Sequence, residues 1–453
     1  MKDKQVMKID SNILISALNL NNCIKFSSNR ISIDSRDIKP GDIFIAINKG
    51  HDFIKSAIEK GAVAAIIDNS SYFIPEKTIL VENTKEALKS IGKYIKTSVG
   101  LKKVIGITGS VGKTTTRTWL NNILSKKFKT SSSIKNYNTI YGLPISLSLI
   151  EEGTEFGIFE MGSNNKGEIS ELSTYLSPDI AILTNIYECH MGKFGTQEAL
   201  AEEKISVLDG LNQNGKLIFD GDSLFRDKIE SKSYEKGIDT ISVGFNDNCD
   251  FKIISYENEI KLKTPIGIID YKLSVSGKHF AYISACVIAA IYALNLDILE
   301  FIPYLKELTQ IKGRGERKEY TFKDKTFFII DDSYNASPSA VLASLDVFDK
   351  IQNNKKIIIL GQMKELGMYE THYHNIVAER LTQMNLYQVI FVGEKSLWPI
   401  MNKIKNISCF EKMDDFVIEK ILKIVQNNSI VLLKGSRSIE LNKFIDYIKC
   451  STI

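Results

Sequence analysis

Signals that mark several specialised protein classes are missing from this 453-residue sequence. The six cysteines are scattered and form no C-x-x-C pair, so the sequence predicts neither a disulfide framework nor a zinc site. The formal net charge is only +4, which gives no reason to expect nucleic acid or an anionic membrane as a partner. There is no internal repeat and no low-complexity tract. What remains is a globular chain with an ordinary apolar content.

Long apolar segments are also missing. The longest apolar run, at 283–294, is too short to cross a bilayer, so we expect no membrane insertion. The first ten residues, MKDKQVMKID, are charged and contain no secretory apolar core. We therefore expect a reduced, cytoplasmic protein. Its length is typical of roughly three domains.

The most informative stretch is VIGITGSVGKTTTRT at 104–118, where an apolar strand runs into a glycine turn and then a helix. The turn directs backbone N–H groups inward, and the start of the helix adds a positive dipole, which together favour a phosphate. The lysine would reach the terminal phosphates, and the first threonine hydroxyl would bind Mg²⁺. The spacing departs from the common G-x-x-x-x-G-K-[ST] pattern because Ile107 stands at the first glycine position. The predicted ATP-binding residues here are Gly109, Ser110, Val111, Gly112, Lys113, Thr114 and Thr115.

The rest of the chain predicts an α/β fold in three parts. Residues 1–100 hold short strands and two predicted helices, enough for a small α/β domain. Strands alternate with helices over 101–312, which is typical of a parallel sheet with crossovers. Within this part, 240–275 has short alternating strands and predicts an antiparallel insert. A glycine-containing charged linker then leads into another alternating unit at 313–453.

Two polar residues follow strands of the central part. Glu160 ends one predicted strand, and His190 lies just beyond the next. Ligands of parallel sheets bind at the carboxyl ends of strands, so both side chains are candidate Mg²⁺ ligands. Mg²⁺ prefers oxygen, so histidine is the less usual choice. A solvated strand end is the alternative for Glu160, and an ordinary structural role is the alternative for His190.

Lys204 occupies an unusual place on a predicted helix. Thr196 can cap this helix, and Leu200 and Val207 belong to its apolar stripe. Lys204 lies on the same stripe, four residues after Leu200. An inward lysine is costly unless it is paired, modified or able to extend outward to solvent. Taken alone, the pattern leaves outward extension as the simpler interpretation.

The last part carries two polar loops after strands. DDSYNASPS at 331–339 presents two carboxylates and an amide where a helix begins, although such residues also serve as ordinary caps. KGSRS at 434–438 offers Lys434, Ser436 and Arg437, which suit a carboxylate or a phosphate. Both loops are therefore candidate binding sites, with ordinary capping as the alternative for 331–339.

Together these motifs resemble those of the Mur ligase family. The resemblance spans nearly the whole chain and includes the segment from His190 to Lys204. The pair DDSYNA and LG-x-M-x-ELG is similar to that of the members that add D-alanyl-D-alanine to a UDP-linked tripeptide. The matching segments, in family order, are DSR, PGDIFIA, TGSVGKTTT, KNYNTIYGLP, EMGSNNKGEI, GKH, GRGE, DDSYNASP and LGQMKELG.

The resemblance implies three domains: one for the uridine nucleotide, a central P-loop ATPase, and a Rossmann-like domain that closes over ATP and binds the incoming dipeptide. It implies that ATP phosphorylates the carboxylate of UDP-N-acetylmuramoyl-tripeptide during peptidoglycan precursor synthesis. The amine of D-Ala-D-Ala then attacks the acyl phosphate, and ADP and phosphate are released. We expect a monomer.

The resemblance also implies roles for single residues. Thr114 and Glu160 would hold one Mg²⁺ and His190 a second, with Lys113 on the phosphates. Lys204 matches the lysine that is N-carbamylated in this family, and a carbamate would make it an anionic metal ligand. The remaining implied contacts are Arg314, Asp331 and Asn335 on ATP, Ser35 and Arg36 toward the uridine nucleotide, and Asn136 and Asn138 toward the muramoyl peptide.

Some positions depart from the family pattern. The usual residues are replaced by Asn165, Thr139, Ile283 and Ser206, and the loop after Ile47 is several residues shorter. None of these changes removes a phosphate or metal ligand, so we expect activity. The alternatives are another Mur-type amino acid ligase, a folylpolyglutamate-type ligase, and an inactive nucleotide-binding homologue. The absence of an N-K-x-D motif argues against a GTPase switch.

Overall fold

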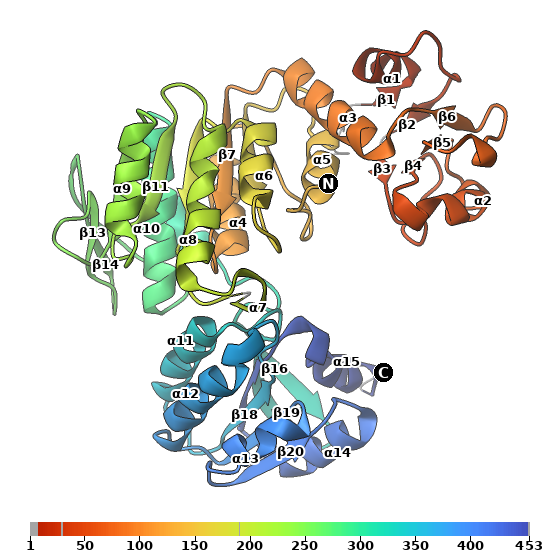
Figure 1. Ribbon diagram of the computed structural model, residues 1–453. Coiled ribbons are helices and arrows are strands. Elements are labelled where there is room, and N and C mark those ends of the chain that lie inside the picture. Colours follow the sequence, from red (N-terminus) through yellow and green to blue (C-terminus); the bar gives the residue numbers. More distant parts are fainter. Residues whose placement is uncertain (1–7, 29, 190, 452–453) are drawn as a thin grey trace.

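The computed structural model describes residues 8–28, 30–189 and 191–451, and it shows three α/β parts (Figure 1). The N-terminal part, in red to orange, lies beside the central part, and the blue C-terminal part lies below the central one. The main sheet of each part falls within one of the predicted segments 1–100, 101–312 and 313–453. The domain bounds themselves stay a prediction.

The N-terminal part contains a two-stranded ribbon and a four-stranded parallel sheet in the order β3-β4-β5-β6. Asn83 caps α3, whose buried Leu88, Ile91 and Ile95 pack toward α1 and toward α5 (Gly142–Ser148) of the central part. The elements are β1 (Ile9–Asp10), α1 (Ser11–Leu18), β2 (Ser27–Ser28), β3 (Ile31–Ser32), β4 (Ile43–Ile45), α2 (Ile54–Glu59), β5 (Ala64–Ile67), β6 (Thr78–Leu80) and α3 (Thr84–Val99).

The central part contains a nine-stranded sheet in the order β15-β14-β13-β12-β11-β10-β7-β9-β8. All pairs from β8 to β13 are parallel, and β14 pairs antiparallel with both β13 and β15. The antiparallel insert predicted over 240–275 is right for β13 to β15 but wrong for β12, which pairs in parallel with β11 and β13 as part of the main sheet. The strands are β7 (Lys103–Thr108), β8 (Thr130–Ser132), β9 (Phe156–Glu160), β10 (Ile180–Leu183), β11 (Lys216–Asp220), β12 (Asp239–Gly244), β13 (Phe251–Ser255), β14 (Ile260–Thr264) and β15 (Gly267–Tyr271).

Helices cover both faces of this sheet, which is why its parallel strands are nearly continuous apolar runs. Buried side chains of α4 and α10 pack on one face, and those of α6, α8 and α9 pack on the other. The helices are α4 (Lys113–Leu124), α5 (Gly142–Ser148), α6 (Glu168–Leu176), α7 (Met191–Phe194), α8 (Gln197–Ile205), α9 (Arg226–Glu235) and α10 (Lys278–Ala293).

The C-terminal part contains a six-stranded sheet in the order β16-β17-β21-β18-β19-β20, in which only β16 is antiparallel. Helices α11 to α13 cover one face, and α14 and α15 cover the other. The elements are β16 (Glu316–Phe322), β17 (Lys325–Asp332), α11 (Pro338–Asp349), β18 (Lys356–Gly361), α12 (Glu370–Thr382), β19 (Gln388–Val392), α13 (Trp398–Met401), β20 (Ile407–Phe410), α14 (Asp415–Ile424), β21 (Ile430–Lys434) and α15 (Asn442–Cys450).

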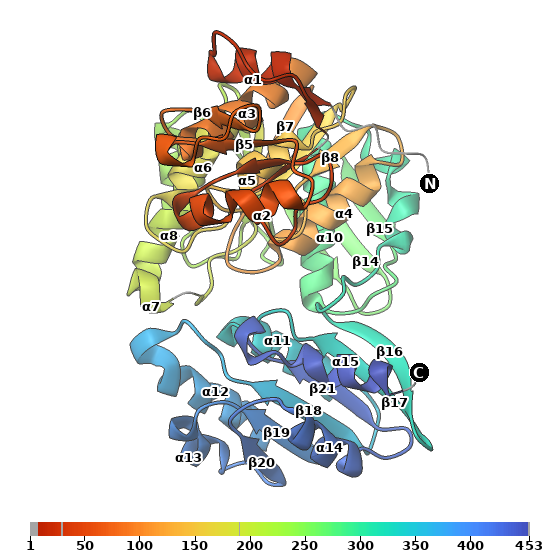
Figure 2. The ribbon, with the colours of Figure 1, turned by 90° about the vertical axis from the view of Figure 1, so that its right-hand side faces the viewer.

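The C-terminal part meets the central part close to the carboxyl ends of the central strands (Figure 2). The short helix α7 contacts the 3₁₀ turn η6 (Gly367–Tyr369), and Gly192 donates its backbone N–H to the Glu365 carbonyl over 2.9 Å. The carboxyl ends of β10, β7 and β9 are neighbours in the sheet. Among the residues described, no helix has the length and apolar character needed to span a membrane.

Candidate functional site

The glycine turn between β7 and α4 forms the floor of the site. Gly109 and Gly112 have φ of +136° and +84°, and a Cβ atom at Gly109 would lie 2.1 Å from Thr184 Oγ1. Asn185 holds the turn, because its Oδ1 accepts the Val111 N–H over 2.9 Å. Helix α4 begins at Lys113 with no side-chain cap, so its first N–H groups are available to an anion.

Lys113 and Thr114 begin the helix beside this turn. Lys113 Nζ donates to the carbonyl oxygens of Gly109 and Ser110 over 2.6 and 3.1 Å, and burial lowers the pKa of its amine. Thr114 Oγ1 donates to Glu160 Oε2 over 3.2 Å and accepts from Arg314 Nη2 over 2.9 Å. Residues from three separate segments therefore meet at one hydroxyl.

Glu160 ends β9 and is only 2% exposed, so the solvated strand end considered as an alternative is wrong. Its Oε1 accepts from Arg117 Nε over 2.7 Å, while its Oε2 faces Thr114. An adjacent hydroxyl and carboxylate fit one Mg²⁺, which binds few protein oxygens and completes its shell with phosphate oxygens and water. Within the described ranges, no group of three or more His, Cys, Asp and Glu side chains is placed to hold a metal.

Lys204 on α8 is 1% exposed, so the outward extension considered above is wrong. Its Nζ donates to Ser163 Oγ over 2.9 Å. Burial, with a smaller contribution from the nearby Lys113 cation, lowers the pKa of the Lys204 amine to about 8. The other predicted ligand of a second metal ion, His190, lies outside the described residues.

The neighbouring Glu203 was not identified from the sequence. It is buried and accepts from the backbone N–H groups of Gly167 and Ile169 over 2.5 and 2.8 Å, so its carboxylate caps α6. Glu203 and Lys204 thus hold two points of the EMGSNNKGEI segment from one turn of α8. The sequence signal for this contact was weak, because an acidic residue beside Lys204 is unremarkable in a helix that contains several acidic residues.

The C-terminal part contributes Arg314, whose guanidinium lies 4.2 Å from the Tyr334 ring centroid and reaches Thr114. Arg437 lies over the same ring at 5.1 Å. Asp331 and Asn335 make local hydrogen bonds instead, Asp331 with the Ser333 hydroxyl and Asn335 with the Ala336 N–H. The structure therefore brings Arg314 to the phosphate turn but shows no contact of Asp331 or Asn335 with it.

The two other C-terminal candidates face different partners. The buried Lys434 forms an ion pair with the partly buried Asp332 at 2.8 Å, beside the His279 ring of the central part. Burial lowers the pKa of His279 to about 4. Ser436 Oγ accepts from the Lys364 N–H over 2.8 Å, so it holds the LGQMKELG loop.

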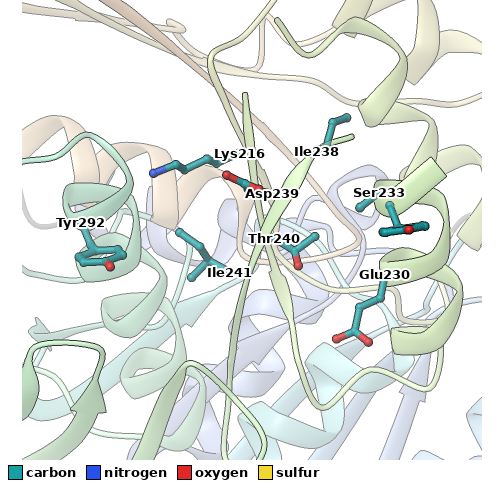
Figure 3. A pocket seen from close by; sticks show the side chains of 9 residues that line it. Lys216, Glu230, Ser233, Ile238, Asp239, Thr240, Ile241 and Tyr292 are labelled. Atoms are coloured by element: carbon teal, nitrogen blue, oxygen red, sulfur yellow. The ribbon is translucent and has the colours of Figure 1, made fainter. Parts of the chain in front are cut away.

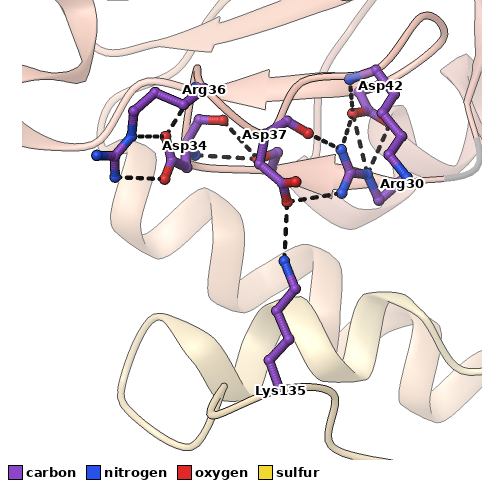
Figure 4. A network of polar contacts seen from close by, with 8 residues as sticks. Arg30, Asp34, Arg36, Asp37, Asp42 and Lys135 are labelled. Atoms are coloured by element: carbon purple, nitrogen blue, oxygen red, sulfur yellow. Dashed lines mark hydrogen bonds and ion pairs between the residues drawn. The ribbon is translucent and has the colours of Figure 1, made fainter. Parts of the chain in front are cut away.

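On the N-terminal side, Arg36 is exposed and forms an ion pair with Asp34 at 2.8 Å, and Ser35 accepts from Lys60 through its carbonyl. Neither residue contacts the phosphate turn in the hydrogen bonds and ion pairs of the described chain. Figure 4 shows how Lys135 bridges the two parts, because its Nζ lies 3.3 Å from Asp37 Oδ2.

The predicted muramoyl-peptide residues lie on the central segment that follows Lys135. The Asn138 N–H donates to the Asn136 carbonyl over 2.9 Å, and the Asn138 carbonyl accepts from the Gly162 N–H over 2.8 Å. Gly162 comes two residues after Glu160. Asn136 and Asn138 are therefore brought beside the strand end that carries the candidate metal ligand.

An open pocket of about 600 Å³ lies elsewhere (Figure 3). It is lined by Lys216 and Asp239, which begin β11 and β12, and by side chains of α9 and α10. The amino ends of parallel strands form the edge of the sheet opposite the phosphate turn, so this pocket is separate from the site.

Comparisons with known proteins agree with this geometry. The chain matches the Mur ligase family catalytic domain over 28–94, the Mur ligase middle domain over 107–291, and the Mur ligase glutamate ligase domain over 313–437. It is 33% identical to the UDP-N-acetylmuramoyl-tripeptide–D-alanyl-D-alanine ligase of Rickettsia prowazekii, covering 97% of this chain and 99% of that one. The chain belongs to the Mur ligase family.

Solved structures extend the comparison for this Mur ligase. A MurF from Acinetobacter baumannii is 25% identical to this chain and superposes with a TM-score of 0.85. The superposition covers 98% of this chain and 99% of that one. The MurF ligase of Thermotoga maritima in complex with ADP is 26% identical, with a TM-score of 0.79 over 93% and 97% of the two chains. The predicted three-domain α/β fold and the family are confirmed.

Proposed function

We propose that this Mur ligase uses ATP to join D-alanyl-D-alanine to UDP-N-acetylmuramoyl-tripeptide. The observation that carries the proposal is the match over 97% of the chain to a ligase of that name. The convergence of Thr114, Glu160 and Arg314 supports the ATP-dependent part, because a phosphate turn, a carboxylate and a cation from another domain meet there.

The phosphate turn and its neighbours would bind ATP. Free N–H groups at the start of α4, with Lys113 and Arg314, place positive charge where negative charge develops on the transferred phosphoryl group. Thr114 and Glu160 would hold Mg²⁺, which when bound supplies further positive charge to the phosphate oxygens. Tyr334 keeps the Arg314 guanidinium oriented toward this point.

The substrates then react in two steps. The tripeptide carboxylate oxygen bonds to the γ-phosphorus, the bond to the ADP oxygen breaks, and an acyl phosphate forms. The D-Ala-D-Ala amine, after losing a proton, attacks the acyl carbon, and inorganic phosphate leaves from the tetrahedral intermediate. Asn136 and Asn138 would hold the muramoyl peptide close to Glu160. The incoming D-Ala-D-Ala would be bound by Lys434, Ser436 and Arg437. Asp331 and Asn335 would turn to ATP once it is bound.

We also propose that Lys204 is carbamylated. A neutral lysine amine can add CO₂ to give a carbamate and a proton, and burial favours the neutral amine. The carbamate would replace a buried cation that lies near Lys113 with an anion able to bind metal, together with His190. Ser163 Oγ, 2.9 Å from Nζ, would orient it.

The protein would act in the cytoplasm as a monomer. All six cysteines are free, which is typical of a reducing compartment. Ser35 and Arg36 would lie toward the uridine nucleotide, in the loop that Asp37 and Lys135 connect to the central part.

Phosphate release from ATP tests the proposal. We expect release only when UDP-N-acetylmuramoyl-tripeptide and D-Ala-D-Ala are both present, with the tripeptide supplied in lysine and diaminopimelate forms. Mass spectrometry should then detect the pentapeptide product. Release that needs neither substrate, or that proceeds with a single amino acid in place of the dipeptide, would overturn the assignment.

A further inference from the structure

Arg117 is a partly buried cation that the reaction described above does not use. It lies on α4 one turn after Thr114, and its side chain is 13% exposed. Its Nε donates to Glu160 Oε1 over 2.7 Å. Its Nη1 donates to the Ser133 carbonyl and lies 3.4 Å from Ser132 Oγ. One guanidinium therefore contacts two different segments.

Ser133 is the anchor of the segment that carries Asn136 and Asn138. The Ser133 hydroxyl accepts from the Glu160 N–H over 2.9 Å, and its own N–H donates to the Ile158 carbonyl over 3.1 Å. Farther along, the Asn138 carbonyl accepts from the Gly162 N–H, and a Cβ atom at Gly162 would lie 3.1 Å from the Asn138 side chain. The segment is thus fixed at both ends against the strand end that bears Glu160.

The contact of one side chain with both the Glu160 carboxylate and the Ser133 carbonyl favours arginine at position 117. A carboxylate as buried as Glu160 is costly without a cationic partner. Arginine offers several N–H donors in a rigid planar fork, so it can hold the carboxylate and the Ser133 carbonyl together. Lysine has a compact ammonium and cannot reproduce that fixed geometry at both partners.

We propose that Arg117 is a positioning residue that couples the nucleotide site to the muramoyl-peptide site. The proposal rests on the function proposed above. Nucleotide binding fixes Thr114 and Glu160, and the shared guanidinium then fixes Ser133 and the segment with Asn136 and Asn138. Because binding linkage is reciprocal, the UDP-linked substrate strengthens nucleotide binding by the same factor.

Titration calorimetry on the full chain tests the coupling. The affinity for UDP-N-acetylmuramoyl-tripeptide is measured with and without saturating Mg²⁺ and a non-hydrolysable ATP analogue. We expect the analogue to tighten tripeptide binding at least about fivefold in the wild type. In Arg117→Lys each ligand alone should bind within about threefold of the wild type, because the ion pair to Glu160 is kept, while the coupling factor falls toward one.

Arg380→Lys is the matched control, since Arg380 also bridges two partners, Asp346 and Asp349, but lies in the C-terminal part. It should keep the wild-type coupling factor. Ser133→Ala is a second variant, which removes the hydroxyl that accepts from the Glu160 N–H. It replaces Arg117→Lys in the test if thermal melting shows that the lysine variant does not fold. Its coupling factor should also fall.

A coupling factor in Arg117→Lys equal to that of the wild type would overturn the inference. If Arg117→Lys does not fold, an unchanged coupling factor in Ser133→Ala would overturn it instead. A wild type that shows no coupling between the two ligands would also overturn it. Ligation assays on the same samples separate this result from the fate of the proposed function. If the wild type ligates and the variants keep its coupling factor, only the role of Arg117 is refuted. A wild type that binds both ligands with Arg117-dependent coupling but makes no pentapeptide defeats only the proposed reaction.

Discussion

Asp220, at the carboxyl end of β11, makes the stability of the protein depend on pH. The side chain is buried, and burial raises its pKa from 3.8 to about 7. At pH values between 3.8 and about 7, Asp220 therefore keeps its proton in the folded protein and has lost it in the unfolded chain. Its contribution to the free energy of unfolding is fully present below the unfolded pKa. It falls as pH rises toward 7, by about 1.4 kcal/mol per pH unit.

The expected size follows from the shift of about three pKa units, which corresponds to about 4 kcal/mol at pH 8. Asp220→Asn removes the titration and keeps the oxygen that accepts from the Asp222 N–H. The variant should gain stability relative to the wild type as pH rises, by about 2–3 kcal/mol between pH 5 and pH 8.

Urea unfolding of both proteins at pH 5, 6, 7 and 8 measures the difference between their free energies of unfolding. Other titrating groups contribute equally to both proteins, so their effects cancel in this difference. Asp270→Asn on β15 is the control, because Asp270 is half-exposed and its substitution should change stability little at any pH. A stability difference between Asp220→Asn and the wild type that stays constant, or that shrinks as pH rises, would refute the reasoning.

Three further predictions concern the site. Gly109→Ala should abolish nucleotide binding in calorimetry, because the added carbon would lie 2.1 Å from Thr184 Oγ1, and unchanged ADP affinity would contradict this. Glu160→Gln should remove most of the Mg²⁺ dependence of ADP binding, and an unaltered Mg²⁺ titration would reject the ligand role. Lys204→Ala should abolish turnover, and bicarbonate should restore activity to CO₂-stripped wild type. A fully active alanine variant would exclude the carbamate.

Local features of the site were predictable from the sequence. The run VIGITGSVGKTTTRT predicted the strand, the turn and the start of α4 at Lys113, because glycine positions and apolar periodicity act over a few residues. The short alternating strands predicted the antiparallel pairs of β13, β14 and β15, but not that β12 belongs to the parallel sheet. The apolar stripe placed Lys204 inward but left its exposure open, since a long side chain can extend from a buried backbone.

Contacts between distant segments were not predictable from periodicity. Arg314 and Thr114 are 200 residues apart, and only the family resemblance suggested that they meet. The pairing of Arg117 with Glu160 was missed, because no local pattern tells which charge a strand end will face. The comparisons confirm the family and the D-alanyl-D-alanine ligase prediction, while the domain bounds and the roles of single residues stay predictions.

The central claim is that three parts of one chain bring ATP to a carboxylate and activate it for an amine. Transfer of an isotope tests this most directly. The tripeptide is labelled with ¹⁸O in its reacting carboxylate, and the phosphate released during ligation is analysed by mass spectrometry. The account predicts that one labelled oxygen moves into each phosphate, because the acyl phosphate breaks at its carbon–oxygen bond. Unlabelled phosphate, released together with pentapeptide, would contradict it.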